Sequence, residues 1–216
     1  MTSTCAPPIH TDVDTVLTTT RSVRRRMDFD RPVERALVEQ CLELALQAPS
    51  GANRQDWIYV AVDNPAQRAA LAEIYRASFR ARYGERSAPT VAGQQLPGPV
   101  SESAHFLADH LSRVPVIVVP ARSAVAPTER AGQASFWASI LPAAWSFMLA
   151  ARSRGLVTSY TARGLDREAE LAGVLGLPYP EVTQAGLIAV GHPDTQSFNP
   201  ARRRPLAGVL SWNRHG

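Results

Sequence analysis

Hydrophobic and polar residues alternate along the chain in patterns that predict several helices. The stretch 12–20 carries apolar residues at helical spacing and predicts a short helix. A longer amphipathic helix is predicted for 32–48, with Pro32 in its first turn. A third helix is predicted to begin at Pro65, with Asn64 as its N-cap.

The longest helical pattern covers residues 129–153. The apolar residues of this stretch form a wide face, which predicts a central helix and is compatible with packing against a second subunit. Pro142 lies inside the pattern and predicts a kink. A short helix is predicted for 165–176, between Asp166 as its cap and Gly176 as its end. The apolar residues of the long stretch recur three and four positions apart, at Phe136, Trp137, Ile140, Leu141, Ala144, Trp145, Met148 and Leu149.

Short runs rich in β-branched residues lie between the helical stretches. They predict strands at 57–63, 114–121, 155–161 and 184–191. Helices and strands therefore interleave, which is typical of α/β or α+β proteins and excludes an all-helical bundle. The stretch 84–103 is rich in proline, glycine and serine, and it predicts either a solvent loop or a mobile lid over a site.

Length and composition fit a single globular domain over 1–216. The chain has 45% hydrophobic and 19% charged residues, which suffices for a proper core. No stretch approaches the ~18 consecutive apolar residues that a membrane-spanning helix needs, and the first residues do not resemble a signal peptide. The two cysteines, Cys5 and Cys41, are too few for a disulfide framework. These features predict a cytoplasmic protein without a membrane partner.

The basic residues are unusual because all 23 of them are arginines, and the formal net charge is +4. Such an excess suits nucleic acid, an anionic membrane or a phosphate-bearing small molecule. Nucleic acid is disfavoured, since the arginines are not interleaved with exposed aromatic residues and no helix-turn-helix or zinc spacing is present. A phosphate clamped between the two ends of the chain fits better, because arginine binds phosphate through paired hydrogen bonds. Three groups of arginines stand out: 21 and 24–26, then 76, 80, 82 and 86, and finally 202–204.

The turn "QAPSGANRQDW" at 47–57 joins a predicted helix to a predicted strand. It is dense in small and amide-bearing residues, which allow a ligand to approach the backbone and offer it a donor and an acceptor together. A plain helix stop explains the turn equally well. The chain has no G-x-S-x-G, Walker or G-x-G-x-x-G motif and no Cys/His set at metal spacing. Its histidines, including His105, His110 and His192, are expected to be structural or surface groups.

Several motifs together resemble the FMN-dependent nitroreductase family, including its iodotyrosine-deiodinase-like branch. They are "RSVRRR", the helix that leads to "APSGANRQDW", the segment "LAARSRGLVTSY", the strand ending "AVGHP" and the terminal "RRRPL". Each motif is weak alone, but they follow the order of the family over nearly the whole chain. The resemblance implies an α+β fold with a mixed, mainly antiparallel sheet flanked by helices. It also implies a homodimer with two FMN sites at the subunit interface.

The resemblance assigns cofactor-binding roles to four segments. The first segment would contact the phosphate and the pyrimidine edge of the ring, the turn would line the flavin, with the Asn53 amide at its polar edge, and the strand would run along its dimethylbenzene-to-N5 side. The C-terminal arginine would bind the phosphate. These residues are Arg21, Ser22, Arg24 and Arg25, then Pro49, Ser50, Gly51 and Asn53, then Thr158, Ser159, Tyr160 and Thr161, and finally Arg203.

The activity implied is ping-pong hydride transfer through flavin N5, from NAD(P)H to nitroaromatic or quinone-like acceptors. No catalytic side chain is required, because the cofactor carries the chemistry. Reductive dehalogenation or a biosynthetic dehydrogenation on the same scaffold is an alternative, and so is a flavin- or nucleic-acid-binding protein without turnover. The chain departs from the family at Thr20, where a second arginine is common, and at Asp56, where proline is common. With threonine at position 20, one phosphate contact of the family is either lost or supplied by Arg25.

Overall fold

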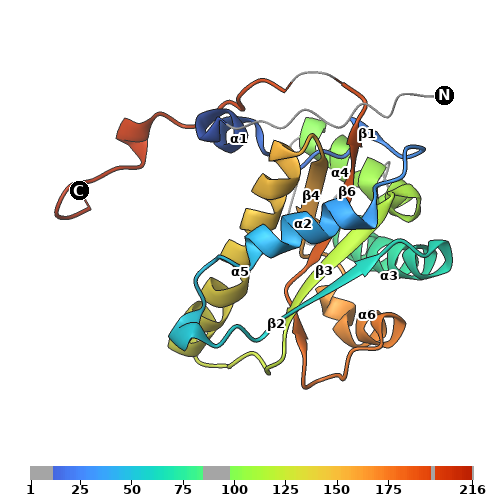
Figure 1. Ribbon diagram of the computed structural model, residues 1–216. Coiled ribbons are helices and arrows are strands. Elements are labelled where there is room, and N and C mark those ends of the chain that lie inside the picture. Colours follow the sequence, from blue (N-terminus) through green and yellow to red (C-terminus); the bar gives the residue numbers. More distant parts are fainter. Residues whose placement is uncertain (1–11, 85–97, 196–197, 216) are drawn as a thin grey trace.

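The computed structural model describes residues 12–84, 98–195 and 198–215. Among these residues, a six-stranded sheet forms the centre of the molecule, with helices on both faces (Figure 1). The path β1-β6-β3-β2 is extended by β4, which pairs with β6, and by β5, which pairs with β3. The strands are β1 (Met27–Asp28), β2 (Trp57–Val62), β3 (Val116–Arg122), β4 (Val157–Thr161), β5 (Thr183–Gln184) and β6 (Leu187–Pro193).

All five strand pairings are antiparallel. One isolated bridge, between Ser22 and Thr158, is parallel. The prediction of a mixed, mainly antiparallel sheet flanked by helices is therefore confirmed. The helices of the described chain are α1 (Val13–Thr19), α2 (Arg35–Ala45), α3 (Pro65–Tyr83), α4 (Gly98–His110), α5 (Arg130–Ser153) and α6 (Glu168–Leu175).

The sheet separates two hydrophobic clusters, because successive side chains of a strand point to opposite faces. In β3, Ile117 and Val119 face the cluster that α3, α4 and α6 cover. Val116 and Val118 face the other cluster, which α2 and α5 cover. The central strands are thus buried on both sides, which explains the continuous apolar run that predicted β3.

The predicted helix boundaries agree with the structure at several points. Asn64 caps α3 by accepting hydrogen bonds from the backbone N–H groups of Ala66 and Gln67, and Pro65 is the first helical residue. α5 covers almost the whole predicted range and continues through Pro142 as one helix. Gly176 ends α6 in the left-handed conformation, with φ 68°. β2 is an edge strand and is mostly half-buried, whereas the sequence pattern predicted a buried strand.

Three boundaries differ from the predictions. α2 begins at Arg35, because the preceding residues stay extended and Val33 is buried in the core. Asp166 accepts a hydrogen bond from Ser78 Oγ and lies in a 3₁₀ turn, so it does not cap α6. Residues 98–103 of the predicted loop or lid are helical, because α4 packs its apolar face, including Leu107, against the core. Residues 85–97 of that loop lie outside the described part of the chain.

Among the described residues, α5 is the one helix that is long and apolar enough to cross a membrane by length and composition. Half of its most apolar window is buried inside the protein, and the core helix of a soluble protein passes the same test. Packing against α2 and the sheet therefore accounts for its composition.

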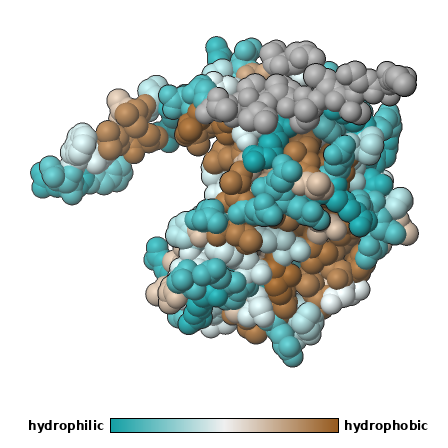
Figure 2. Space-filling model, in the orientation of Figure 1, coloured by the Kyte–Doolittle hydropathy of each residue, from teal (hydrophilic) through white to brown (hydrophobic). Residues whose placement is uncertain are grey.

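The C-terminal arm, residues 199–215, extends away from the body of the molecule (Figure 1). It contains a 3₁₀ turn at Leu206–Gly208. Hydrophobic side chains gather along its middle part (Figure 2). Four large ones are exposed in the single chain: Leu206, Val209, Leu210 and Trp212.

Candidate functional site

The first arginine segment lies beside β4, so the structure brings together two of the predicted site segments. Ser22 forms the parallel bridge with Thr158, and the Val23 N–H donates to the Thr158 carbonyl over 2.8 Å. Ser22 and Tyr160 line an apolar groove of about 280 Å³, whose other wall is α5. The α5 residues of this wall are Leu141, Ala144, Trp145 and Met148.

Arg21, which directly precedes Ser22, lies beside Arg152 and Phe198. Its Nε and Nη2 atoms are buried and have no hydrogen-bond partner in the described structure. The Ser159 hydroxyl on β4 is also buried without a partner. Buried polar atoms normally find partners, and those that lack one often await a ligand or water. The segment is therefore suited to a ligand that carries hydrogen-bond acceptors and negative charge.

The other arginines of this segment have different surroundings. Burial lowers the pKa of the Arg24 guanidinium, and the neighbouring Tyr75 acts weakly in the opposite direction. Arg25 pairs with Glu102 over 3.0 Å at the surface. Arg25 was one of the two alternatives for the phosphate contact that Thr20 cannot make. In this structure its charge is paired with that of Glu102.

The structure does not bring Arg203 to Arg21 within one chain. Arg203 is exposed on the C-terminal arm, and it donates a hydrogen bond to the carbonyl of Arg202 over 3.1 Å. The resemblance to the family implies that Arg21 and Arg203, from the two ends of the chain, bind the same phosphate. In the single chain the arm instead points away from the sheet (Figure 1).

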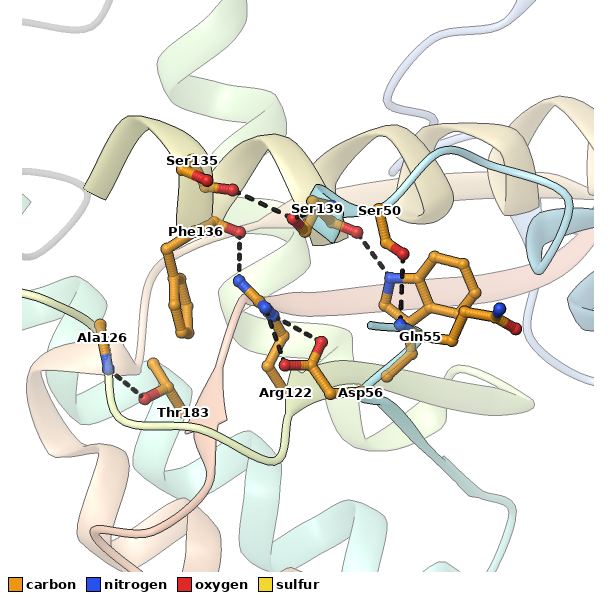
Figure 3. Close-up of polar contacts among 11 residues, drawn as sticks. Ser50, Gln55, Asp56, Arg122, Ala126, Ser135, Phe136, Ser139 and Thr183 are labelled. Atoms are coloured by element: carbon orange, nitrogen blue, oxygen red, sulfur yellow. Dashed lines mark hydrogen bonds and ion pairs between the residues drawn. The ribbon is translucent and has the colours of Figure 1, made fainter. Parts of the chain in front are cut away.

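The turn at 47–57 is fixed to α5 through Ser139 (Figure 3). The Gly51 N–H donates to Ser139 Oγ over 2.9 Å, and Trp57 Nε1 donates to the Ser139 carbonyl over 2.5 Å. Within the turn, the Gln55 N–H donates to Ser50 Oγ over 3.2 Å, and Gln55 Nε2 donates to Asn53 Oδ1 over 2.9 Å. The Asn53 side chain is exposed, so its amide N–H₂ is available to a ligand.

The same turn contains backbone strain. Ala52, Asn53 and Gln55 have φ angles of 54°, 53° and 52°, in the left-handed region. This conformation costs an L-residue about 1–2 kcal/mol, and such residues cluster at functional sites. The bonds to Ser139 and Ser50 hold the turn in this shape. The backbone N–H groups of Gly51, Asn53, Arg54 and Gln55 already have acceptors in the protein, so the exposed Asn53 amide is the donor that this turn can offer to a flat ligand.

Asp56 forms a buried ion pair that the sequence did not reveal. Its carboxylate accepts two hydrogen bonds from Arg122, from Nε over 2.9 Å and from Nη2 over 2.7 Å (Figure 3). Arg122 also donates to the Phe136 carbonyl over 2.8 Å and lies 4.3 Å from the centroid of the Phe136 ring. The pair thus joins the turn, the end of β3 and α5. The signal in the sequence was a single arginine directly after the most apolar strand.

The Asp56–Arg122 pair should make stability depend on acid pH. The Arg122 hydrogen bonds lower the pKa of Asp56 below its ordinary value of 3.8. A carboxylate with a lowered pKa in the folded state stabilises the protein above its unfolded-state pKa, and this contribution is lost as the pH falls. Urea unfolding of wild type and Asp56→Asn should therefore differ most above pH 5, and the difference should shrink below about pH 4. A pH-independent difference would show that the charge of Asp56 is not what stabilises the turn.

The two parts of the predicted site are far apart within one chain. The turn contacts α5 at Ser139, whereas Arg21 lies near Arg152, which is thirteen residues further along the same helix. At a rise of 1.5 Å per residue the two points on α5 are roughly 20 Å apart. The turn borders a separate, more polar cavity of about 320 Å³, which Arg54 and Arg122 help to line.

Cys41 is not a candidate nucleophile. Burial raises the pKa of its thiol to about 11, so it stays protonated at neutral pH. The predicted minor role of the histidines is consistent with His192, which is buried and whose pKa is lowered by burial.

Comparisons with known proteins show the family of the chain. The model of the Nitroreductase family matches residues 17–192. An NADH dehydrogenase of Thermus thermophilus is 31% identical over 218 aligned residues, which cover 93% of this chain and 96% of that protein.

Two solved structures share the fold. The FMN and NADPH-dependent nitroreductase NfnB of Sphigopyxis sp. strain HMH, crystallised as a mutant, has a TM-score of 0.68 and 24% identity, over 94% of this chain and 99% of that one. An iodotyrosine deiodinase bound to FMN and 3-iodo-L-tyrosine has a TM-score of 0.69 and 18% identity, over 94% and 100%. With most of its length matched by the family model and by the Thermus relative, the chain belongs to the nitroreductase family and is a flavoprotein oxidoreductase of that family.

Proposed function

We propose that the protein uses FMN to transfer electrons from NAD(P)H to nitroaromatic or quinone-like acceptors. The observation that carries this proposal is the half-buried Arg21, which has two unpartnered nitrogen atoms and directly precedes Ser22, a residue that lines an apolar groove. A flavin mononucleotide has the matching chemistry, a phosphate joined to a flat and largely apolar ring system. FMN held there would supply hydride-transfer chemistry between a reduced nicotinamide and a second substrate, in a ping-pong sequence.

The residues of this chain have separate tasks in the proposal. Arg21 would bind the phosphate, and Ser22 and Tyr160, which line the apolar groove, would contact the ring, with the remainder of β4 from Thr158 to Thr161 beside them. Arg24 would face the pyrimidine edge of the ring, where its positive charge would stabilise negative charge on the reduced flavin. The apolar wall from α5 excludes water on one side.

We further propose that the protein is a homodimer and that each site uses residues from both subunits. The turn with Pro49, Ser50, Gly51 and Asn53 contacts α5 at Ser139 and does not line the groove that Ser22 and Tyr160 form in the described chain, which supports this view. A second apolar groove of about 310 Å³ lies between α1, α2 and α5, with Leu17 and Leu44 exposed on it. The C-terminal arm exposes apolar residues of its own (Figure 2). Exposed apolar patches of this kind are typical of protein interfaces.

A cytoplasmic location also remains a proposal. Cys41 is a free, buried thiol in the described structure, which agrees with a reducing compartment.

The purified protein should be yellow, with an absorbance band near ~450 nm that belongs to oxidised flavin. Anaerobic addition of NADH or NADPH should bleach this band, and a nitroaromatic or quinone should restore it. Restoration by a halogenated tyrosine instead would move the assignment to reductive dehalogenation. A coloured protein that neither nicotinamide reduces would contradict the proposed electron donor, and a protein that takes up no flavin would overturn the proposal.

A further inference from the structure

Two arginines meet beside Phe198 without a carboxylate between them in the described part of the chain. Arg152, in the last turn of α5, lies beside Arg21, and both guanidinium groups face the ring of Phe198, at 4.8 and 6.0 Å from its centroid. Arg152 Nε donates a hydrogen bond to Thr19 Oγ1 over 3.1 Å. In the described part of the chain neither arginine has an acidic partner, so this arginine pair leaves two positive charges unmatched.

The surroundings of the arginine pair make this arrangement costly. Burial lowers the pKa of Arg152, and the charge of Arg21 lowers it further. The described residues around the pair are Thr19, Thr20, Thr158, Phe198 and three aliphatic side chains, and none of them is acidic. Two like charges that share a partly desolvated site repel each other unless an anion binds between them.

We propose that Arg152 is a second phosphate-binding residue of the FMN site and acts together with Arg21. This inference rests on the proposed function, which already assigns the phosphate to Arg21. Thr20, the neighbour of Arg21, carries no charge, and its hydroxyl donates to the Val16 carbonyl over 2.6 Å. The charge that Thr20 cannot provide comes from α5, because Arg152 reaches the same place from the other side.

The bound phosphate takes the place of the Phe198 ring. The free space at the arginine pair is about 10 Å³, room for about one water molecule, so a phosphate enters only when the half-buried Phe198 side chain moves out. A dianionic phosphate gains charge-assisted hydrogen bonds there, and these are stronger than the contacts of the two guanidinium groups with an aromatic ring.

Affinity for FMN and for riboflavin, which lacks the phosphate, separates this role from a structural one. Both constants are measured on flavin-free, full-length protein by quenching of flavin fluorescence. Arg152→Gln, which keeps a donor for Thr19 but removes the charge, should weaken FMN binding by about tenfold to a hundredfold and change riboflavin binding by less than about twofold. Arg152→Lys should keep part of the preference for FMN, since it keeps the charge without the planar fork.

Arg154→Gln is the matched control. Arg154 is also half-buried at the end of α5, but it donates to Ser153 Oγ over 3.1 Å and does not face the arginine pair. This variant should leave the ratio of the two affinities unchanged. Phe198→Ala should not weaken FMN binding, because the ring only fills the site.

The outcomes distinguish this inference from the proposed function. If wild type prefers FMN to riboflavin and Arg152→Gln keeps that preference, Arg152 is not a phosphate ligand, and the proposed function stands. Equal losses for FMN and riboflavin assign Arg152 a structural role and also overturn the inference. If Arg152→Gln does not fold, an unchanged FMN-to-riboflavin ratio in Arg152→Lys overturns it. A wild-type protein that binds neither flavin overturns both proposals.

Discussion

Asp56→Asn should lower the free energy of unfolding by about 3 kcal/mol, which for a chain of this size corresponds to a fall in Tm of roughly 6–12 °C. The variant leaves Arg122, whose side chain is 5% exposed, without its counter-charge. Removing one partner of a buried pair costs more than the pair itself contributes, because the remaining charge stays desolvated. Asp56 is 18% exposed, so partial access of water places the effect at the lower end of the usual range.

The pair of Arg35 and Asp63 is a matched control on the surface. It has the same two-pronged geometry, with distances of 2.6 and 2.9 Å, but its side chains are 79% and 36% exposed. Exposed pairs contribute little, since water solvates both partners in either state. Asp63→Asn should therefore leave Tm almost unchanged. Equal losses for Asp56→Asn and Asp63→Asn in thermal unfolding would contradict the role given to burial.

The loss at Asp56 should reach the turn that precedes it. Ala52, Asn53 and Gln55 hold left-handed conformations that the surrounding bonds must maintain. With the Arg122 contact weakened, limited proteolysis should cut between residues 50 and 56 faster than in wild type. Unchanged protection of this turn would show that Ser139 alone holds it.

Mixing two inactive variants should restore activity if each site is built from two subunits. Arg21→Glu damages the phosphate end of the site, and Asn53→Ala damages the turn that the partner contributes. In a mixed dimer one site then carries both changes and the other carries neither. Random reassortment gives mixed dimers in half of the population, so about a quarter of all sites should be intact.

The measurement is bound FMN and nitroreductase turnover after the two variants are unfolded and refolded together. Each variant refolded alone is the control and should stay nearly inactive. If Arg21 and Asn53 serve the same site within one chain, every site of a mixed dimer carries one change and no recovery occurs. Absence of recovery in dimers shown to be mixed would therefore overturn the shared site.

Local patterns predicted most of the architecture correctly. The continuous apolar run of β3 indicates a strand buried on both faces, since successive side chains of a strand point to opposite sides. The apolar residues that recur three and four positions apart along α5 indicate a helix with a wide buried face. Caps such as Asn64 and Gly176 are equally local, since they bond to neighbouring backbone groups or adopt a left-handed angle themselves. The order of motifs along the chain also indicated the nitroreductase family, which the comparisons confirmed.

The candidate site depended more on contacts between distant residues. The resemblance placed Arg21, the turn and Arg203 around one flavin. In the single chain the turn contacts α5 at Ser139, whereas Arg21 lies near Arg152 in the last turn of the same helix. Arg203 is exposed on the C-terminal arm. Arg25 was a possible substitute for the arginine that is absent at position 20, but it forms an ion pair with Glu102. Distances of this kind are set by how helices pack on the sheet and cannot be read from spacing.

The sequence by itself determined the alternating elements, the antiparallel fold and the family, because each depends on periodic burial or on motifs carried in order along the chain. Only the tertiary structure decided that Asp56 is held by Arg122 and that Arg152 stands beside Arg21. In both cases the partners are more than sixty residues apart, and they meet because the fold closes around a shared core. The role of a charged side chain depends on such neighbours, since burial and pairing together determine its desolvation free energy and which ligand it can bind.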